Sequence, residues 1–243
     1  MDALTNNLVI FIALVFGYLV GSIPTGVIIG RLFYKKDPRD YGSHASGGTN
    51  TSRTLGKTAG VIVIALDALK AIAVFWTAWA LLTYVPYLAS LPLFDGGLTA
   101  MWATLVACSI GHCYPLYIRF KGGKTVAVYM GSTGGVTWAF FALDLIVFNV
   151  VYKVGKKKNV VSFASIFSGL ILTLSTWAFT LWAELGATDI SFLFWHFGFA
   201  GLTFSYQQAV ATTLIYALLV WRHRENIVRM KNNTESEYKL VGK

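Results

Sequence analysis

Charge is scarce in this chain of 243 residues. Asp, Glu, Lys and Arg together make up 13% of it, whereas hydrophobic residues make up 56% and the mean hydropathy is +0.60. A soluble domain of this length could not bury so much apolar surface. The composition therefore excludes an ordinary soluble domain and indicates that lipid surrounds most of the chain.

Cysteine is also scarce, with Cys108 and Cys113 as the only two. They lie five positions apart in an apolar segment, and a helix places such positions on roughly opposite faces. This spacing favours neither a disulfide nor a pair of metal ligands. We expect no metal and no cofactor.

Long apolar runs predict the membrane-spanning helices, because a helix needs about 20 residues to cross the hydrocarbon layer. The stretch 125–152 is too long for one crossing and contains a glycine cluster, so we divide it into two spans. The predicted spans are residues 8–30, 70–91, 99–118, 125 to about 136, 137–153, 160–183 and 203–221. The sequence thus predicts an all-α polytopic membrane protein with seven spans in a single domain, 1–243.

The distribution of basic residues orients these spans. If the amino terminus lies outside, the segments 31–57, 119–124 and 153–158 and the tail from Arg222 lie inside, and they hold 19 of the 20 Lys and Arg residues. The outside segments contain no Lys or Arg, and their charged residues, which include Asp95, are all acidic. This asymmetry is typical of the positive-inside rule and places the carboxyl terminus in the cytoplasm. A model with six spans would put the basic cluster 153–158 outside, and we reject it.

The net charge of +9 has the same explanation. In a soluble protein such an excess of basic residues would suggest nucleic-acid binding. Here it follows from topology, and no nucleic-acid partner is expected.

A first polar segment, 41–53, reads YGSHASGGTNTSR. Its glycines allow the backbone to approach a ligand closely, and Ser43, Thr49, Asn50 and Arg53 can donate hydrogen bonds to phosphate oxygens. A flexible Gly/Ser loop is the alternative interpretation.

A second segment, Phe120 to Thr125, reads FKGGKT and comes directly before an apolar run. Gly122 and Gly123 at a helix start would expose free N–H groups, and Lys124 adds a cation beside them. This combination predicts an anion site, although any loop on the inner side would be basic.

A third segment, 222–229, reads RHRENIVR and extends the last span into the cytoplasm. In a helix, His223 and Asn226 share one face that could meet a polar substrate at the membrane surface. The alternative is a stop-transfer cluster that only fixes orientation. Neither His223 nor Asn226 is needed for that role.

Taken in order, these segments resemble the bacterial glycerol-3-phosphate acyltransferases that use acyl phosphate as donor, the PlsY family. The resemblance runs from Gly21 to Glu235 and is carried by 42–57 (GSHASGGTNTSRTLGK), 112–127 (HCYPLYIRFKGGKTVA) and 222–229. It implies a bacterial inner-membrane enzyme, active at the cytoplasmic face as a monomer. Such an enzyme transfers a fatty acyl group to the 1-hydroxyl of glycerol 3-phosphate and produces lysophosphatidic acid and phosphate.

The resemblance also assigns roles to residues. Ser43, Lys124, His223 and Asn226 become the catalytic group. The phosphate-binding group comprises Ser43, Thr49, Asn50, Arg53, Gly122, Gly123 and Lys124.

The chain departs from the family pattern at four positions. The family usually has Gly-Asn where His44 and Ala45 stand, so a polar contact is missing or is supplied by His44. It usually has glycine where Thr125 and Asn233 stand.

Two alternatives remain open at this point. Within the enzyme class, Ser43 could act as a nucleophile with His223 as its base. Outside that class, Asp144 within a predicted span could indicate a transporter of a phosphorylated solute.

Two further predictions assign structural roles to other polar residues. Asp67 and Lys70, three positions apart, should form an ion pair on a helix face near the inner surface. His112 should have a packing or helix-end role.

Overall fold

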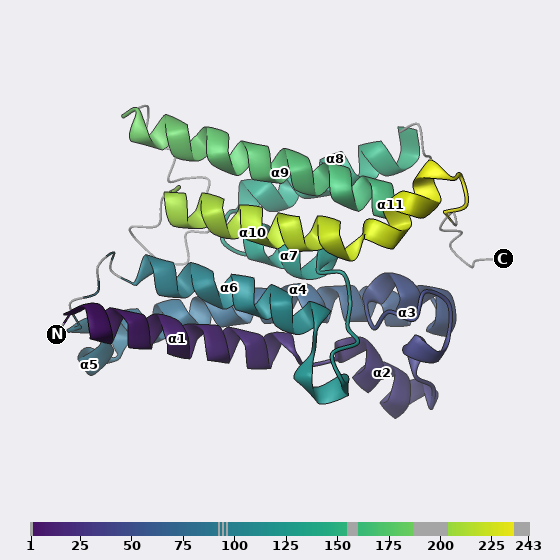
Figure 1. The fold of residues 1–243 in the computed structure, drawn as a ribbon, viewed down its shortest axis with the longest axis horizontal. Coiled ribbons are helices and arrows are strands. Elements are labelled where there is room, and N and C mark those ends of the chain that lie inside the picture. The colour runs from purple at the N-terminus through teal and green to yellow at the C-terminus, as the bar shows by residue number, and fades with distance from the viewer. Residues whose placement is uncertain are drawn as a thin grey trace.

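The computed structural model describes residues 2–91, 93, 95, 97–154, 160–186 and 204–235, which form helices and loops without a strand. The longer helices lie side by side as a bundle, with the amino terminus at one end (Figure 1). The helices are α1 (Asp2–Gly21), α2 (Thr25–Tyr34), η1 (Pro38–Asp40), α3 (Gly48–Leu55), α4 (Lys57–Tyr84), α5 (Pro86–Ala89), α6 (Leu98–Cys113), η2 (Leu116–Ile118), α7 (Val126–Gly134), α8 (Trp138–Val154), α9 (Val161–Glu184), α10 (Tyr206–Arg222) and α11 (Arg224–Lys231).

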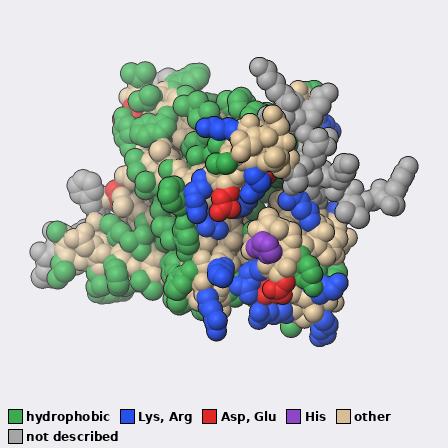
Figure 2. Space-filling view, turned by 45° about the vertical axis from the view of Figure 1, so that its right-hand side comes forward, with side chains coloured by type: hydrophobic (Ala, Val, Ile, Leu, Met, Phe, Trp, Pro, Cys, Tyr) green, Lys and Arg blue, Asp and Glu red, His purple; other side chains and the backbone are tan. Residues whose placement is uncertain are grey.

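The surface of the bundle suits a lipid environment. Helix α1 exposes Leu8 and Phe11, α4 exposes Leu69, and α9 exposes Leu174 and Leu181. Three helical stretches of the described residues are long and apolar enough to cross a membrane, namely Ala3–Tyr34, Lys57–Tyr84 and Val161–Glu184. Figure 2 shows hydrophobic side chains over much of the molecule, whereas Lys and Arg gather on the end of the bundle that this view brings forward.

Close packing of α1 against α6 depends on two glycines. A Cβ atom at Gly17 or Gly21 would overlap the backbone of Thr104 or Cys108. Small residues four positions apart let two helix backbones approach, which is the usual way in which membrane helices associate. Cys108 and Cys113 are buried and free.

The first predicted span, 8–30, lies within the apolar stretch Ala3–Tyr34, but this stretch is not one continuous helix. The structure has a break at Ser22–Pro24 between α1 and α2. Pro24 has no N–H to donate and disfavours helical geometry in the residue before it. The break leaves the carbonyl oxygen of Ile23 available, and Lys70 Nζ donates to it at 3.2 Å.

The second predicted span, 70–91, is displaced from the observed helix. Helix α4 begins at Lys57 and ends at Tyr84, where Pro86 starts the short α5. Asp67 and Lys70 do form the predicted ion pair, at 2.8 Å, but both side chains are buried rather than placed on an exposed face. Because the pair is satisfied inside the bundle, the helix continues through it.

The remaining predicted spans agree with α6 to α10 to within a few residues, apart from the end of the third, where α6 stops at Cys113 rather than at residue 118. The start of the last span, at 203, and the basic cluster at 156–158 lie outside the described residues. The predicted division of 125–152 is present, with α7 and α8 separated at Gly135–Thr137.

Candidate phosphate and acyl-transfer site

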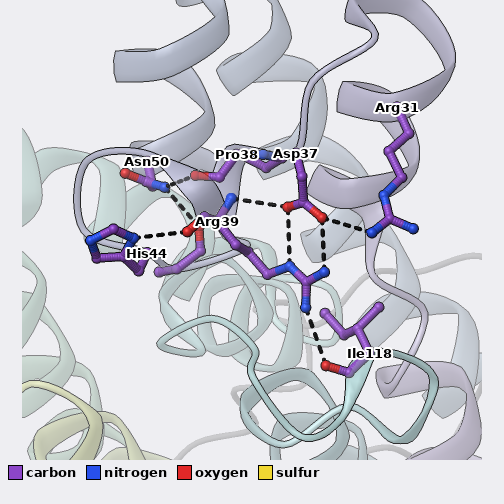
Figure 3. Close-up of polar contacts among 8 residues, drawn as sticks. Arg31, Asp37, Pro38, Arg39, His44, Asn50 and Ile118 are labelled. Atoms are coloured by element: carbon purple, nitrogen blue, oxygen red, sulfur yellow. Dashed lines mark hydrogen bonds and ion pairs between the residues drawn. The ribbon is translucent and has the colours of Figure 1, made fainter.

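The loop between α2 and α3 is organised by Arg39. Its guanidinium donates to both carboxylate oxygens of Asp37, at 3.0 and 2.8 Å, and to the Ile118 carbonyl at 3.2 Å (Figure 3). The hydrogen bond from Arg39 lowers the pKa of Asp37 to about 2. The contact with Ile118 joins the residues just before the first polar segment to those just before the second.

Asn50 has a structural role in the same loop. Its amide nitrogen donates to the carbonyls of Pro38 and Ala45 at 2.7 and 2.9 Å, and its Oδ1 accepts the Ser43 N–H at 2.8 Å. The side chain is 2% exposed. In this arrangement Asn50 shapes the loop and has no proton left for a phosphate, so our prediction of a direct contact is not supported by the geometry.

His44 does not replace the polar contact that Ala45 lacks. Its Nδ1 pairs with the Arg39 carbonyl at 2.8 Å, away from the cavity described below (Figure 3). His44 has φ of 54°, which is a left-handed conformation that glycine adopts without strain. The backbone at position 44 is therefore left-handed although the residue is not glycine.

Gly122 and Gly123 of the second segment do not begin a helix, contrary to our prediction. Helix α7 begins at Val126, and the Gly123 N–H donates to the His112 carbonyl at 3.0 Å. A Cβ atom at Gly123 would overlap the His112 ring, and one at Gly122 would overlap the His112 carbonyl. The N–H of Gly123 is therefore already used, and both glycines serve close packing against the end of α6.

Lys124 does reach the site. Its Nζ donates to Asn226 Oδ1 at 2.5 Å, which links the second segment to the third across 102 positions of sequence. Burial, and then the positive charge of Arg229, lower the pKa of Lys124 to about 8. A buried ammonium of this kind is well suited to bind an anion.

His223 ends α10 as its C-cap and is 3% exposed. Its Nδ1 lies 2.8 Å from the Leu219 carbonyl, which can only accept a hydrogen bond, so the ring proton is on Nδ1 and Nε2 is an acceptor. Burial lowers the pKa of His223 to about 4. The imidazole is therefore neutral near pH 7.

Sequence reasoning missed the support for Asn226. The amide nitrogen of Asn226 donates to Ser162 Oγ at 2.8 Å and to Glu235 Oε1 at 2.6 Å, and Arg229 Nε donates to Glu235 Oε2 at 2.6 Å. Burial alone would raise the pKa of Glu235, but the hydrogen bonds from Asn226, Arg229 and Ser162 lower it. The only sequence signal was that Glu235 closes the region of family resemblance.

One cavity of about 450 Å³ brings the three segments together. It is lined at its polar part by Ser43, Thr49, Asn50, Arg53, Lys57, Asp67, His112, Lys124, Ser162, His223 and Asn226. Its apolar part is formed by α4, α7 and α8, with side chains such as Ile64, Met130 and Phe148. Of the predicted site residues, only Gly122 and Gly123 do not line the cavity.

Asp144, which suggested a transport pathway, lines this same cavity. Among the described residues, no group of three or more His, Cys, Asp or Glu could hold a metal ion. The site is therefore a pocket with basic and hydroxyl groups at one part and an apolar wall at another, as expected of an enzyme that joins an anion to a lipid chain.

The described residues form an all-helical protein of the integral membrane class, with a pocket that has a basic part and an apolar part, and comparisons with known proteins identify it further. The sequence matches the family described as glycerol-3-phosphate acyltransferase over residues 11–233. A glycerol-3-phosphate acyltransferase of Enterococcus faecalis is 38% identical over 233 residues, with 93% of this chain and 91% of the relative covered. One from Staphylococcus haemolyticus is 35% identical, with 96% of this chain and 100% of the relative covered.

A solved structure leads to the same family. The crystal structure of PlsY (YgiH), an integral membrane glycerol 3-phosphate acyltransferase in its glycerol 3-phosphate form, superposes with a TM-score of 0.69 at 28% identity. The match covers 95% of this chain and 96% of that one. The chain belongs to the glycerol-3-phosphate acyltransferase family, and the acyltransferase interpretation of the sequence is confirmed.

Proposed function

We propose that the acyl donor of this glycerol-3-phosphate acyltransferase is acyl phosphate and that the cavity of the three segments is the active site. The single observation that carries the proposal is that one cavity is lined by Arg53, Lys124 and His223, which lie on α3, before α7 and after α10. An acyl phosphate is already activated. The protein therefore mainly has to hold two anionic substrates and align a hydroxyl with a carbonyl.

Arg53 and Lys124 are the proposed phosphate ligands, assisted by the hydroxyls of Ser43 and Thr49. A guanidinium binds phosphate oxygens in a bidentate manner, and an ammonium adds a compact charge. Asn226 holds Lys124 while Ser162 and Glu235 orient the Asn226 amide. Lys124 is thereby held in place before the substrate arrives.

His223 and Asn226 are proposed to place the acceptor. Because Nε2 of His223 is an acceptor, it suits a hydrogen bond from the other hydroxyl of glycerol 3-phosphate, which leaves the proton of the 1-hydroxyl for transfer. The hydroxyl oxygen forms the new ester bond to the carbonyl carbon, and the bond from that carbon to the phosphate oxygen breaks. The departing phosphate takes the hydroxyl proton, so that no acyl-enzyme is formed.

The apolar wall of the cavity is proposed to hold the start of the acyl chain. Val126 and Met130 of α7 and Leu145 and Phe148 of α8 line this part of the cavity. The bilayer supplies the donor and takes up the product. We propose seven spans for the whole chain, with this cavity at the cytoplasmic face of the bacterial inner membrane.

The alternative with Ser43 as nucleophile makes a different prediction. It requires an acyl group bound to Ser43 Oγ during turnover. Rapid quenching followed by mass spectrometry of the intact protein separates the two mechanisms. A stable acyl adduct on Ser43 would replace direct transfer.

Purified protein mixed with acyl phosphate and glycerol 3-phosphate tests the site. Lys124→Ala and Arg53→Ala should each lower the rate of phosphate release by about 100-fold, as the loss of a charged donor to the reacting group commonly does. Lys121→Ala is the matched control, because Lys121 is an exposed lysine of the same loop and does not line the cavity. Unchanged rates in Lys124→Ala and Arg53→Ala would refute the proposed site.

A further inference from the structure

A buried polar cluster lies at the wall of the cavity, which two of its three members line, and the proposed function assigns no role to any of them. It comprises Asp67 and Lys70 of α4 and His112 of α6, all at most 8% exposed. Lys70 Nζ lies 2.8 Å from Asp67 Oδ1, 3.0 Å from His112 Nδ1 and 3.2 Å from the Ile23 carbonyl. Its three protons thus have three acceptors, and the Thr25 hydroxyl also donates to Asp67 Oδ1, at 2.6 Å.

This arrangement determines the orientation of the His112 ring. Nδ1 of His112 lies 3.0 Å from Lys70 Nζ and 3.4 Å from Asp67 Oδ1, so this edge of the ring faces both members of the ion pair. Breaking one partner of a buried ion pair is costly, and Asp67 therefore holds Lys70 firmly in this position. The buried pair therefore fixes the orientation of the His112 ring.

His112 in turn supports the loop that carries Lys124. Its carbonyl accepts the Gly123 N–H at 3.0 Å, and the three atoms nearest to a Cβ placed at Gly123 all belong to the His112 ring. From the other direction, Arg222 Nε donates to the Gly123 carbonyl at 3.1 Å. Gly123 is therefore held between His112 and Arg222, directly before Lys124.

We propose that His112, fixed by the buried pair of Lys70 and Asp67, is a positioning residue that sets the Gly122–Lys124 loop and thereby places the Lys124 ammonium for substrate phosphate. The inference rests on the proposed role of Lys124. It explains why two charged side chains of α4 are buried as a pair. It also explains why a ring, and not a smaller side chain, lies against Gly123.

Steady-state kinetics of the purified enzyme test the proposal. His112→Ala should raise the KM of at least one phosphate-bearing substrate by about tenfold or more, because small displacements of a binding group cost rate and affinity on this scale. A purely structural role would instead lower the amount of folded enzyme, and so the apparent kcat, with both KM values unchanged. That second pattern would overturn the proposal. If His112→Ala cannot be purified, the KM values of the double variant Asp67→Asn/Lys70→Met are measured instead. This variant keeps His112 but removes the ion pair that fixes its ring, so the same two patterns support or overturn the proposal.

A double-mutant cycle tests the contact itself. Gly123→Ala should be impaired because its methyl group overlaps the His112 ring, and adding His112→Ala should cause little further loss, since both changes disturb one contact. Gly122→Ala is the matched control, because it overlaps the His112 carbonyl, which the His112→Ala change leaves in place. Additive losses for Gly123→Ala with His112→Ala would overturn the contact as the means of positioning.

Lys124→Ala separates this inference from the proposed function. If Lys124→Ala retains full activity, the site assignment itself fails. If Lys124→Ala is inactive while His112→Ala has normal KM values, the site stands and the positioning role of His112 is refuted.

Discussion

Three residues of this chain take a left-handed backbone conformation where the family pattern has glycine. His44, Thr125 and Asn233 have φ values of 54°, 58° and 55°. Asparagine tolerates this region well, whereas a β-branched residue such as threonine is a marked exception. Of these three residues, Thr125 therefore bears the largest conformational strain.

Thr125→Gly should stabilise the protein. The substitution removes left-handed strain of about 1 kcal/mol and a buried hydroxyl that has no hydrogen-bond partner among the described residues. Thermal unfolding in detergent measures the change. Thr137→Gly is the control, because Thr137 is equally buried with an unpartnered hydroxyl but has no positive φ, and it should lower the melting temperature. A lower melting temperature for Thr125→Gly would contradict the strain argument.

Lys124 should make the enzyme sensitive to alkaline pH. Because burial lowers its pKa to about 8, the ammonium is present below that pH and is lost as the pH rises through it. The value of kcat/KM should fall about tenfold per pH unit above this point, since it reports ionisations of the free enzyme.

The variant Lys124→Arg tests whether Lys124 causes this loss of activity at alkaline pH. Its residual activity should persist to higher pH because a guanidinium stays charged. Lys121→Arg should leave the profile unchanged. If kcat/KM of Lys124→Arg falls at the same pH as that of the unchanged enzyme, another group is responsible for the loss.

At the scale of the helices, polar positions rather than apolar runs account for the errors in the predicted spans. Pro24 interrupts the first apolar run, and the Ile23 carbonyl exposed there is bound by Lys70 from α4. The second span was predicted to begin at Lys70, whereas the pairing of Asp67 and Lys70 inside the bundle lets α4 run through both from Lys57. A sequence window averages hydropathy and cannot reveal which polar side chains will meet a partner.

The Gly122–Gly123 pair shows the same limitation. Its position before an apolar run suggested a helix start with free N–H groups. In the structure α7 begins at Val126, and the glycines instead allow the loop to lie against His112. A glycine needed for close packing and a glycine needed for a ligand look identical in sequence.

For the molecule as a whole, the proposed orientation can be tested by thiol labelling. Native Cys108 and Cys113 are buried and should give little background. A membrane-impermeant thiol reagent applied to intact cells should label Tyr87→Cys and Leu185→Cys, both at exposed positions on the proposed outer side.

The matched inner-side variants are Lys35→Cys and Arg224→Cys, which are also at exposed positions. They should react only after the cells are opened. Labelling of Lys35→Cys and Arg224→Cys on opposite sides of the membrane would rule out a shared cytoplasmic pocket.

Much of this protein could be derived from its sequence. The scarcity of charge, the apolar runs and the three polar segments led to an integral membrane acyltransferase, because hydropathy and short motifs are local properties. Arg53, Lys124, His223 and Asn226 were selected for their chemistry, and the structure places all four at one cavity.

Only the tertiary structure decided how the parts of the site depend on one another. Asn50 proved to be the centre of a loop, Glu235 the partner of Asn226, and His112 the residue on which Gly123 rests. These relations join positions far apart in the chain. They depend on distances of a few ångströms between helices, and such distances arise only when the whole bundle packs.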